Sequence, residues 1–164
     1  LVIDGLNDSK KLTAKRREAL FPVIVENAIS YGIAYASVEE IDTLDILRAT
    51  LLAMSRAVAQ LTPQPALALI DGNRAPALDM PARTVIGGDG KCASIAAASV
   101  LAKVSRDRLM TELDAMYPEY GFAVHKGYGT KAHEAALRQY GPCKIHRRSF
   151  LKKYFAEDGT WIRK

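Results

Sequence analysis

Two short apolar runs that lead into aspartate and glycine, followed by a long helix-forming stretch, constrain the fold of this chain most. The first run, residues 67–70, ends on Asp71, and the second, residues 84–86, leads into a glycine-rich turn that contains Asp89. Apolar runs bounded by glycine are typical of buried strands, and a following helix favours an α/β sheet. Because open α/β sheets bind ligands beyond their strand ends, we expect the two aspartates to be functional.

Helical spacing and capping residues predict the elements that precede this stretch. Residues 14–28 show a helical pattern with Thr13 as N-cap, and Pro22 should kink or restart that helix. Residues 31–38 alternate in a way typical of a strand. A helix capped by Ser37 or Thr43 should then bury one apolar stripe, formed by Leu47, Leu51, Met54, Val58 and Leu61. We expect the acidic side chains before it, Glu39, Glu40 and Asp42, to favour the helix N-terminus rather than to bind a metal.

The second half of the chain predicts two helices and two segments rich in aromatic and basic residues. Small residues from position 93 to about 117 favour a long, closely packed helix. Thr130 and Gly141 are the expected start and stop signals of a shorter helix that ends at Tyr140. Aromatic and basic side chains mix before this helix, in residues 117–129, and after it, in residues 145–154. We see no internal repeat or second domain, so we expect a single domain over residues 1–164.

Charge is distributed unevenly along the chain. Residues 125–164 carry 10 Lys and Arg against 3 Asp and Glu, a net of +7, whereas residues 1–124 carry 13 against 15, a net of −2. A basic segment on a near-neutral body favours a polyanionic partner, although a solvated surface would show the same pattern. No apolar run is long enough for a bilayer, so we expect no membrane partner. Cys92 and Cys143 form no CxxC pair, so we expect no zinc and a reduced, cytoplasmic setting. We also expect a monomer.

The two aspartates suggest a site for hard cations. If the two strands are neighbours, Asp71 and Asp89 converge at one sheet edge, where carboxylates suit Mg²⁺ or Mn²⁺. Two such ions can activate a water and stabilise the leaving oxygen of a phosphodiester. From the residues alone, an ordinary role for both aspartates in turns stays open.

Several longer segments resemble the type 2 ribonucleases H, and among them bacterial ribonuclease HII. They include GLNDSKKL, LIDGN, AAASVLAKVSRD, HKGYGT and HRRSF, and they occur in the order found in that family. The matching segments are residues 5–12, 69–73, 88–89, 96–107, 117–122, 125–130 and 146–150, which together extend over nearly all of the chain.

The resemblance implies an RNase H-like fold, a mixed β-sheet flanked by helices with a C-terminal helical segment. It implies an endonuclease that cuts the RNA strand of RNA–DNA hybrids and cuts at ribonucleotides embedded in duplex DNA, as in DNA replication and repair. Such enzymes hold two divalent cations, Mn²⁺ or Mg²⁺, with four carboxylates. By the resemblance, Asp71 is the third of these acids and Asp89 the fourth, so both are expected as catalytic metal ligands.

The resemblance also implies a set of substrate-binding residues. Tyr128 matches the tyrosine that packs on the sugar at the RNA–DNA junction, where a planar ring favours a deoxyribose over a 2′-hydroxyl. Ser9 and Lys10 match a turn that contacts the nucleic-acid backbone, and an ammonium there neutralises a phosphate. The match further places four residues near the substrate: Ser99, Lys103, His125 and Lys126.

One part of the family pattern is missing from this sequence. The family's first two acids, an adjacent Asp-Glu in a motif with Gly-Arg-Gly, should precede the 5–12 segment, and Asp4 does not match them. The strand-like start at residues 1–3 therefore suggests an N-terminally truncated chain, for which we expect marginal stability and little nuclease activity. The alternatives are a catalytically inactive nucleic-acid-binding remnant of the same family and a phosphatase for small substrates.

Overall fold

The computed structural model describes residues 3–163 and divides into two compact units. Unit 1 consists of the residues up to Tyr35 together with Thr50–Arg106, and unit 2 of Ala36–Ala49 together with the residues from Asp107 onwards. Helices and a small parallel sheet make the α/β architecture expected from the sequence. Of the strand-like start, residues 1 and 2 lie outside the described residues.

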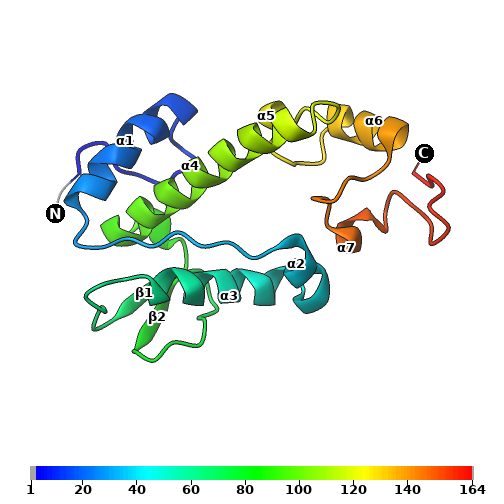
Figure 1. Ribbon diagram of the computed structural model, residues 1–164. Coiled ribbons are helices and arrows are strands. Elements are labelled where there is room, and N and C mark those ends of the chain that lie inside the picture. Colours follow the sequence, from blue (N-terminus) through cyan, green and yellow to red (C-terminus); the bar gives the residue numbers. More distant parts are fainter. Residues whose placement is uncertain (1–2, 164) are drawn as a thin grey trace. The chain divides into compact units, whose positions relative to one another are not determined.

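The two strands of unit 1 pair as the sequence predicts. Strand β1, Ala68–Asp71, runs parallel to β2, Ala82–Val85, and Asp71 lies opposite Val85 (Figure 1). Burial alternates along β1, with Ala68 and Ile70 inside and the residues between and after them exposed, as a strand with one covered face requires. Because parallel strands end at the same edge, residues that follow β1 and β2 come close together.

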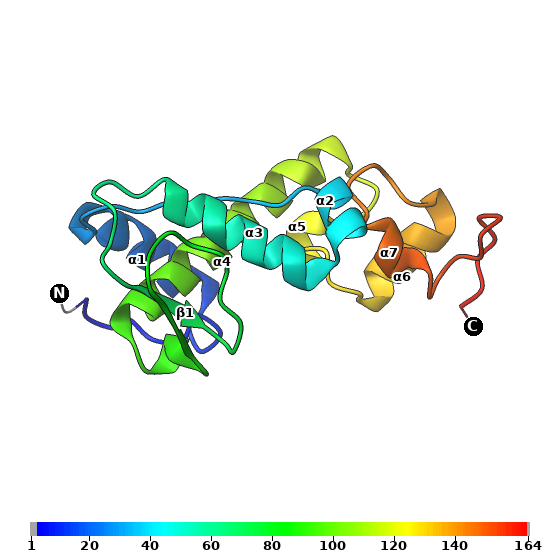
Figure 2. The same ribbon diagram turned by 90° about the horizontal axis from the view of Figure 1, so that it is seen from below.

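Helix α1, Ala14–Asn27, packs along the first half of α4, Ala93–Met116 (Figures 1 and 2). Thr13 caps α1 by accepting a hydrogen bond from the backbone N–H of Arg16, as expected. The helix runs through Pro22 without a restart, contrary to one of the two outcomes expected there. Its buried Leu20 and Ile24 pack against α4, and this burial offsets the backbone hydrogen bond that proline cannot donate.

The prediction of a strand over residues 31–38 is wrong. The structure has no regular secondary structure from residue 31 to Ser37, and Val38 begins a helix. Two side chains at the C-terminal end of α3 and just beyond it bind the segment instead. Arg56 of α3 donates to the Tyr35 carbonyl, and Gln60, which follows the helix, bonds both the N–H and the C=O of Ile33. Alternation predicts an extended backbone, but it does not supply the partner strand that a sheet requires.

A break after seven residues divides the helical region predicted next. Ser37 and Glu40 form a capping box at the start of α2, Val38–Leu44, which ends at Asp45 with a φ of 80° before α3, Ile46–Ala59. The apolar stripe is core only in part: Leu47 is 48% exposed and the other four stripe residues are partly buried, whereas Ala49 is the buried residue of α3. Periodicity identifies a helix face but not what covers it.

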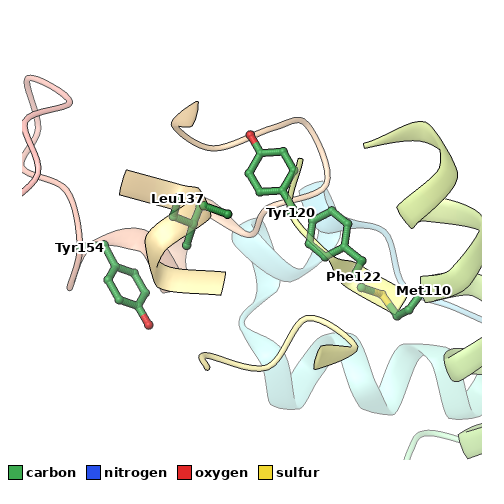
Figure 3. Packing of buried hydrophobic residues seen from close by; sticks show 6 residues of the cluster. Met110, Tyr120, Phe122, Leu137 and Tyr154 are labelled. Carbon is green, nitrogen blue, oxygen red and sulfur yellow. The ribbon is translucent and has the colours of Figure 1, made fainter. Parts of the chain in front are cut away.

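Unit 2 is built around aromatic rings. Its short helices after α4 are α5, Phe122–His125, α6, Lys131–Tyr140, and α7, Arg148–Leu151. Thr130 caps α6 and Gly141, with a φ of 72°, ends it, as expected. The core contains Met110, Tyr120, Phe122, Ala136, Leu137 and Tyr154 (Figure 3). The rings of Tyr120 and Phe122 stack with their centroids 5.3 Å apart.

Two further features concern membrane-spanning helices and the cysteines. Within residues 3–163, none of the helices combines the length and the apolar character needed to cross a bilayer. Cys92 and Cys143 are both free thiols.

Candidate active site

The carboxylate of Asp71 links the ends of the two strands. It follows Ile70 at the end of β1, and its Oδ1 accepts a hydrogen bond of 2.8 Å from the backbone N–H of Gly88. Gly88 begins the short 3₁₀ turn η1, Gly88–Gly90, so this bond holds Asp71 against the residue that precedes Asp89. Asp71 is thereby bound to the turn that bears Asp89, and the convergence of the two carboxylates stays a prediction.

Asp89 lies beside a hollow of unit 1. The hollow has a volume of ≈ 390 Å³ and is lined by residues 3, 6 and 7, by η1 from Asp89 onwards and by the start of α4. Asp89 is partly buried, whereas Asp71 is exposed and is not among the residues that line the hollow. The hollow therefore gives access to one of the two candidate ligands.

Gly88 is a site residue that sequence reasoning missed. A Cβ atom at this position would lie 2.5 Å from Cδ1 of Ile95 and 3.3 Å from Cβ of Val85. Only glycine therefore brings the backbone N–H close enough to hold Asp71. The signal in the sequence is the glycine immediately before Asp89, in the glycine-rich turn that follows the second apolar run.

The donor set at the strand ends suits a hard cation in part. Two carboxylates with access to water can hold Mg²⁺ or Mn²⁺ when substrate phosphates complete the coordination. Within the described part of the chain, no group of three or more His, Cys, Asp or Glu is placed to hold a metal ion. Asp71 and Asp89 therefore stay predicted metal ligands, and a two-ion site requires further oxygen ligands.

A fixed turn presents the predicted substrate residues Ser9 and Lys10. The Asp8 carboxylate accepts from the backbone N–H of Lys10 at 2.9 Å. Arg17, from α1, donates to the carbonyls of Ser9 and Leu12. Ser9 is 7% exposed, and Lys10 is exposed at the surface. The arrangement holds the backbone rigid and leaves the Lys10 ammonium in solvent.

Ser99 and Lys103 lie one helical turn apart on α4 in unit 1. Residues four apart share a helix face, so the two side chains are neighbours. The Ser99 hydroxyl donates to the carbonyl of Ala96 at 2.8 Å, and both residues are partly buried. Both stay predicted substrate residues.

His125 and Lys126 are held by unit 2 itself. His125 is 7% exposed, and its two ring nitrogens bond the Tyr120 carbonyl and the Gly127 N–H at 2.6 and 3.2 Å. The Lys126 ammonium donates to the Asp107 carbonyl and to the Thr111 hydroxyl of α4. The structure therefore gives both residues a role in fixing the loop, and direct contact with substrate stays a prediction.

Tyr128 combines a fixed backbone with an exposed ring. Its N–H donates to the His125 carbonyl, its own carbonyl accepts from the ring of His133, and its side chain is 66% exposed. Such a ring can stack on a sugar or base. Asp71 and Asp89 belong to unit 1 and Tyr128 to unit 2, so a binding site shared by all three stays a prediction.

The sequence also gave no indication of a chain of buried polar groups next to Tyr128. His133 Nε2 lies 3.0 Å from His146 Nε2, and His146 Nδ1 accepts from the backbone N–H of Cys143 at 3.0 Å. Burial is the main cause that lowers the pKa of His133 and lowers that of His146 to about 4. Both rings are therefore neutral at pH 7.

Comparisons with known proteins show which family the chain resembles. The family description "Ribonuclease HII" matches residues 3–154. A curated ribonuclease HII 1 of Methylibium petroleiphilum is 61% identical over 148 residues, which are 90% of this chain and 75% of that protein. A ribonuclease HII of Burkholderia lata is 58% identical over 148 residues, 90% of this chain and 69% of that protein.

A solved structure supports the same fold. The crystal structure of the ribonuclease H2 from Pyrococcus horikoshii OT3 matches with a TM-score of 0.70 and 26% identity, covering 88% of this chain and 76% of that one. The α/β RNase H-like fold expected from the sequence is thus confirmed. On the family match and these relatives, the chain belongs to the ribonuclease HII family, whose members are endoribonucleases.

Proposed function

We propose that this protein hydrolyses the RNA strand of RNA–DNA hybrids and cuts at ribonucleotides embedded in duplex DNA. The observation that carries the proposal is the hydrogen bond between Asp71 and Gly88, which sets one carboxylate beside the turn that bears the other. These are the two acids that the family resemblance marks as metal ligands. Family membership supplies the class of reaction.

The proposed chemistry uses two divalent cations, Mn²⁺ or Mg²⁺, when bound. Such ions lower the pKa of a water nucleophile and stabilise the oxygen that leaves the phosphodiester. Asp71 and Asp89 are the residues of this chain that would hold them. The Gly88 N–H occupies Oδ1 of Asp71, so Oδ2 is the oxygen that would bind a cation.

Three groups of side chains suit a nucleic-acid substrate. The solvent-exposed Lys10 can neutralise a phosphate, and Ser9 and Lys126 lie in fixed turns that can follow a backbone. The exposed ring of Tyr128 can pack on a sugar, where a 2′-hydroxyl changes the fit. We assign the choice of the RNA–DNA junction to this ring and propose that the protein acts as a cytoplasmic monomer.

A cleavage assay tests the proposal. The substrate is a labelled DNA duplex with a single ribonucleotide, incubated with Mn²⁺ or Mg²⁺ and with either this chain or the chain extended at its N-terminus by the family's Asp-Glu motif. We expect the extended chain to cut next to the ribonucleotide and to leave an all-DNA duplex intact. Failure of the extended chain to cut with either metal would overturn the proposal.

A non-catalytic nucleic-acid-binding protein is the second candidate. The net charge of +7 over residues 125–164 favours it, because Lys and Arg side chains can bind phosphates without a metal-binding site. Hybrid binding that persists in Asp71→Asn and Asp89→Asn, without cleavage by the extended chain, would support this candidate. Cleavage that both substitutions abolish would exclude it.

A further inference from the structure

The hydrogen bonds around His133 and His146 allow one arrangement of protons. His146 Nδ1 accepts from the N–H of Cys143, so the proton of the neutral ring lies on Nε2. That Nε2–H donates to His133 Nε2, 3.0 Å away. The proton of His133 then lies on Nδ1 and donates to the carbonyl of Tyr128 at 2.9 Å. A continuous relay therefore runs from the Cys143 backbone to the Tyr128 backbone.

The residues of this relay are packed on all sides. His133 and His146 are 6% and 9% exposed, and the His133 ring stacks on His125 with centroids 4.3 Å apart at an interplanar angle of 11°. Phe122 contacts all three histidine rings edge-on or tilted. Packing fixes each ring, so the hydrogen bond to Tyr128 has a fixed direction.

A second set of bonds holds the loop from its other side. His125 bonds the Gly127 N–H through its ring and the Tyr128 N–H through its carbonyl. The backbone N–H of Thr130 also donates a hydrogen bond of 2.9 Å to the Tyr128 carbonyl. Every backbone polar group of Tyr128 is therefore occupied, although its side chain is 66% exposed.

We propose that His133, supported by His146 and Cys143, is a positioning residue that holds the Tyr128 ring in the orientation that reads the RNA–DNA junction. The inference rests on the proposed function, in which Tyr128 contacts the sugar. None of the relay residues has to touch substrate, because their effect passes through the Tyr128 carbonyl.

Two substitutions at His133 separate positioning from packing alone. In His133→Asn the amide nitrogen can take the place of Nδ1 and donate to Tyr128, whereas His133→Ala removes that donor. The first measurement is hydrogen exchange at the amides of Tyr128 and Thr130. We expect exchange about tenfold faster in His133→Ala, as for one lost hydrogen bond, and close to wild type in His133→Asn.

The second measurement is the cleavage ratio of the extended chain for a single-ribonucleotide duplex against a continuous RNA–DNA hybrid. We expect the ratio to fall about tenfold in His133→Ala and to recover in His133→Asn, because junction choice depends on the orientation of the ring. A purely structural role would lower both rates together and leave the ratio unchanged. An unchanged ratio, or unchanged exchange, in His133→Ala would overturn the proposal.

A third variant and the wild type keep the outcomes distinct. If His133→Ala does not fold, His146→Asn carries the same comparison, since its amide oxygen still accepts from Cys143 but no Nε2–H remains for His133. An extended chain with no substitution that cleaves neither duplex contradicts the proposed function. The exchange comparison still decides in that case whether His133 holds the loop.

Discussion

The Asp71 carboxylate has a structural bond and a proposed catalytic role, and two substitutions separate them. In Asp71→Asn the amide oxygen can still accept from the Gly88 N–H, so we expect a melting temperature near that of wild type. The loss of charge should lower metal-dependent cleavage by the extended chain at least about 100-fold. Thermal unfolding and initial cleavage rates check both expectations.

Asp71→Ala is the matched control, because it removes the acceptor as well as the charge. We expect it to lose cleavage to the same extent and, in addition, about 1 kcal/mol of stability. Cleavage by Asp71→Asn at a rate near wild type would contradict the assignment of Asp71 as a metal ligand.

Gly88 and Gly90 lie two residues apart but should respond differently to a methyl group. A Cβ at Gly88 meets Ile95 and Val85, whereas a Cβ at Gly90 meets nothing within 4 Å. We expect Gly88→Ala to destabilise the protein by about 1–3 kcal/mol through overpacking and Gly90→Ala to be nearly neutral. Urea unfolding of both variants measures the difference, and equal effects would contradict the tight approach at Gly88.

At the scale of elements, a residue far away in sequence caps helix α7. The Asp42 carboxylate of α2 accepts from the backbone N–H groups of Arg148 and Ser149 at 2.7 and 2.9 Å. Partial burial alone raises the pKa of Asp42, but the bonds from Ser149 and Arg148 and the charge of Arg147 outweigh it, so the pKa lies below its usual value. The ionised form is therefore the one that stabilises α7.

We expect Asp42→Ala to cost about 1–2 kcal/mol, in the range of helix-capping losses, and Asp42→Asn to cost less. A lowered pKa means that the stabilisation is complete above the usual pKa of aspartate and is lost as pH falls below it. The difference in unfolding free energy between wild type and Asp42→Ala should accordingly shrink between about pH 4 and pH 2. A difference independent of pH would contradict this account.

The sequence predicts helix ends well where a capping or stop residue next to the helix determines them. The caps Thr13 and Thr130 and the stop at Gly141 were predicted correctly, because each acts within four residues of its own helix. Ser37, one of the two caps expected for the next helix, instead caps the short α2 that precedes α3. The strand expected over residues 31–38 failed because its backbone is bound by side chains of distant residues, Arg56 and Gln60. Hydrogen bonds between residues so far apart in the sequence produce no periodic pattern from which they could be predicted.

The candidate site was predictable to the same extent. The positions of Asp71 and Asp89 after two strands followed from the apolar runs and their glycines. The glycine before Asp89 was visible in the sequence, but its role as a donor was missed, because that role depends on the space that Ile95 leaves. The relay of His133 and His146 was missed because the two histidines are 13 residues apart, and only the fold of unit 2 brings their rings together.

For the molecule as a whole, the two relay histidines predict a stability that depends on pH. Their pKa values are lowered in the folded protein, mainly by burial, to about 4 for His146, whereas an unfolded histidine titrates near 6.5. The unfolded chain therefore binds more protons in this range, and stability present above about pH 6.5 falls as the pH drops towards 4. We expect the midpoint of urea unfolding to decrease over this interval.

A double variant isolates the contribution of these histidines from that of the carboxylates. In His133→Asn/His146→Asn neither relay ring can titrate, so the decline between pH 6.5 and 5 should be much weaker, whatever the stability at pH 7. The same slope in wild type and in the double variant would show that other groups cause the acid sensitivity.

The proposed phosphate contact at Lys10 predicts how the affinity for nucleic acid responds to salt. A cationic side chain that binds a phosphate releases counterions, so the logarithm of affinity should fall linearly with the logarithm of salt concentration. Each phosphate contact contributes a slope of about −0.9. We expect Lys10→Ala, in the fixed turn before α1, to reduce the slope for an RNA–DNA hybrid by about one contact. Lys15→Ala, an exposed residue of α1, is the control and should leave it unchanged. Equal slopes for the two variants would place the phosphate contacts elsewhere on the molecule.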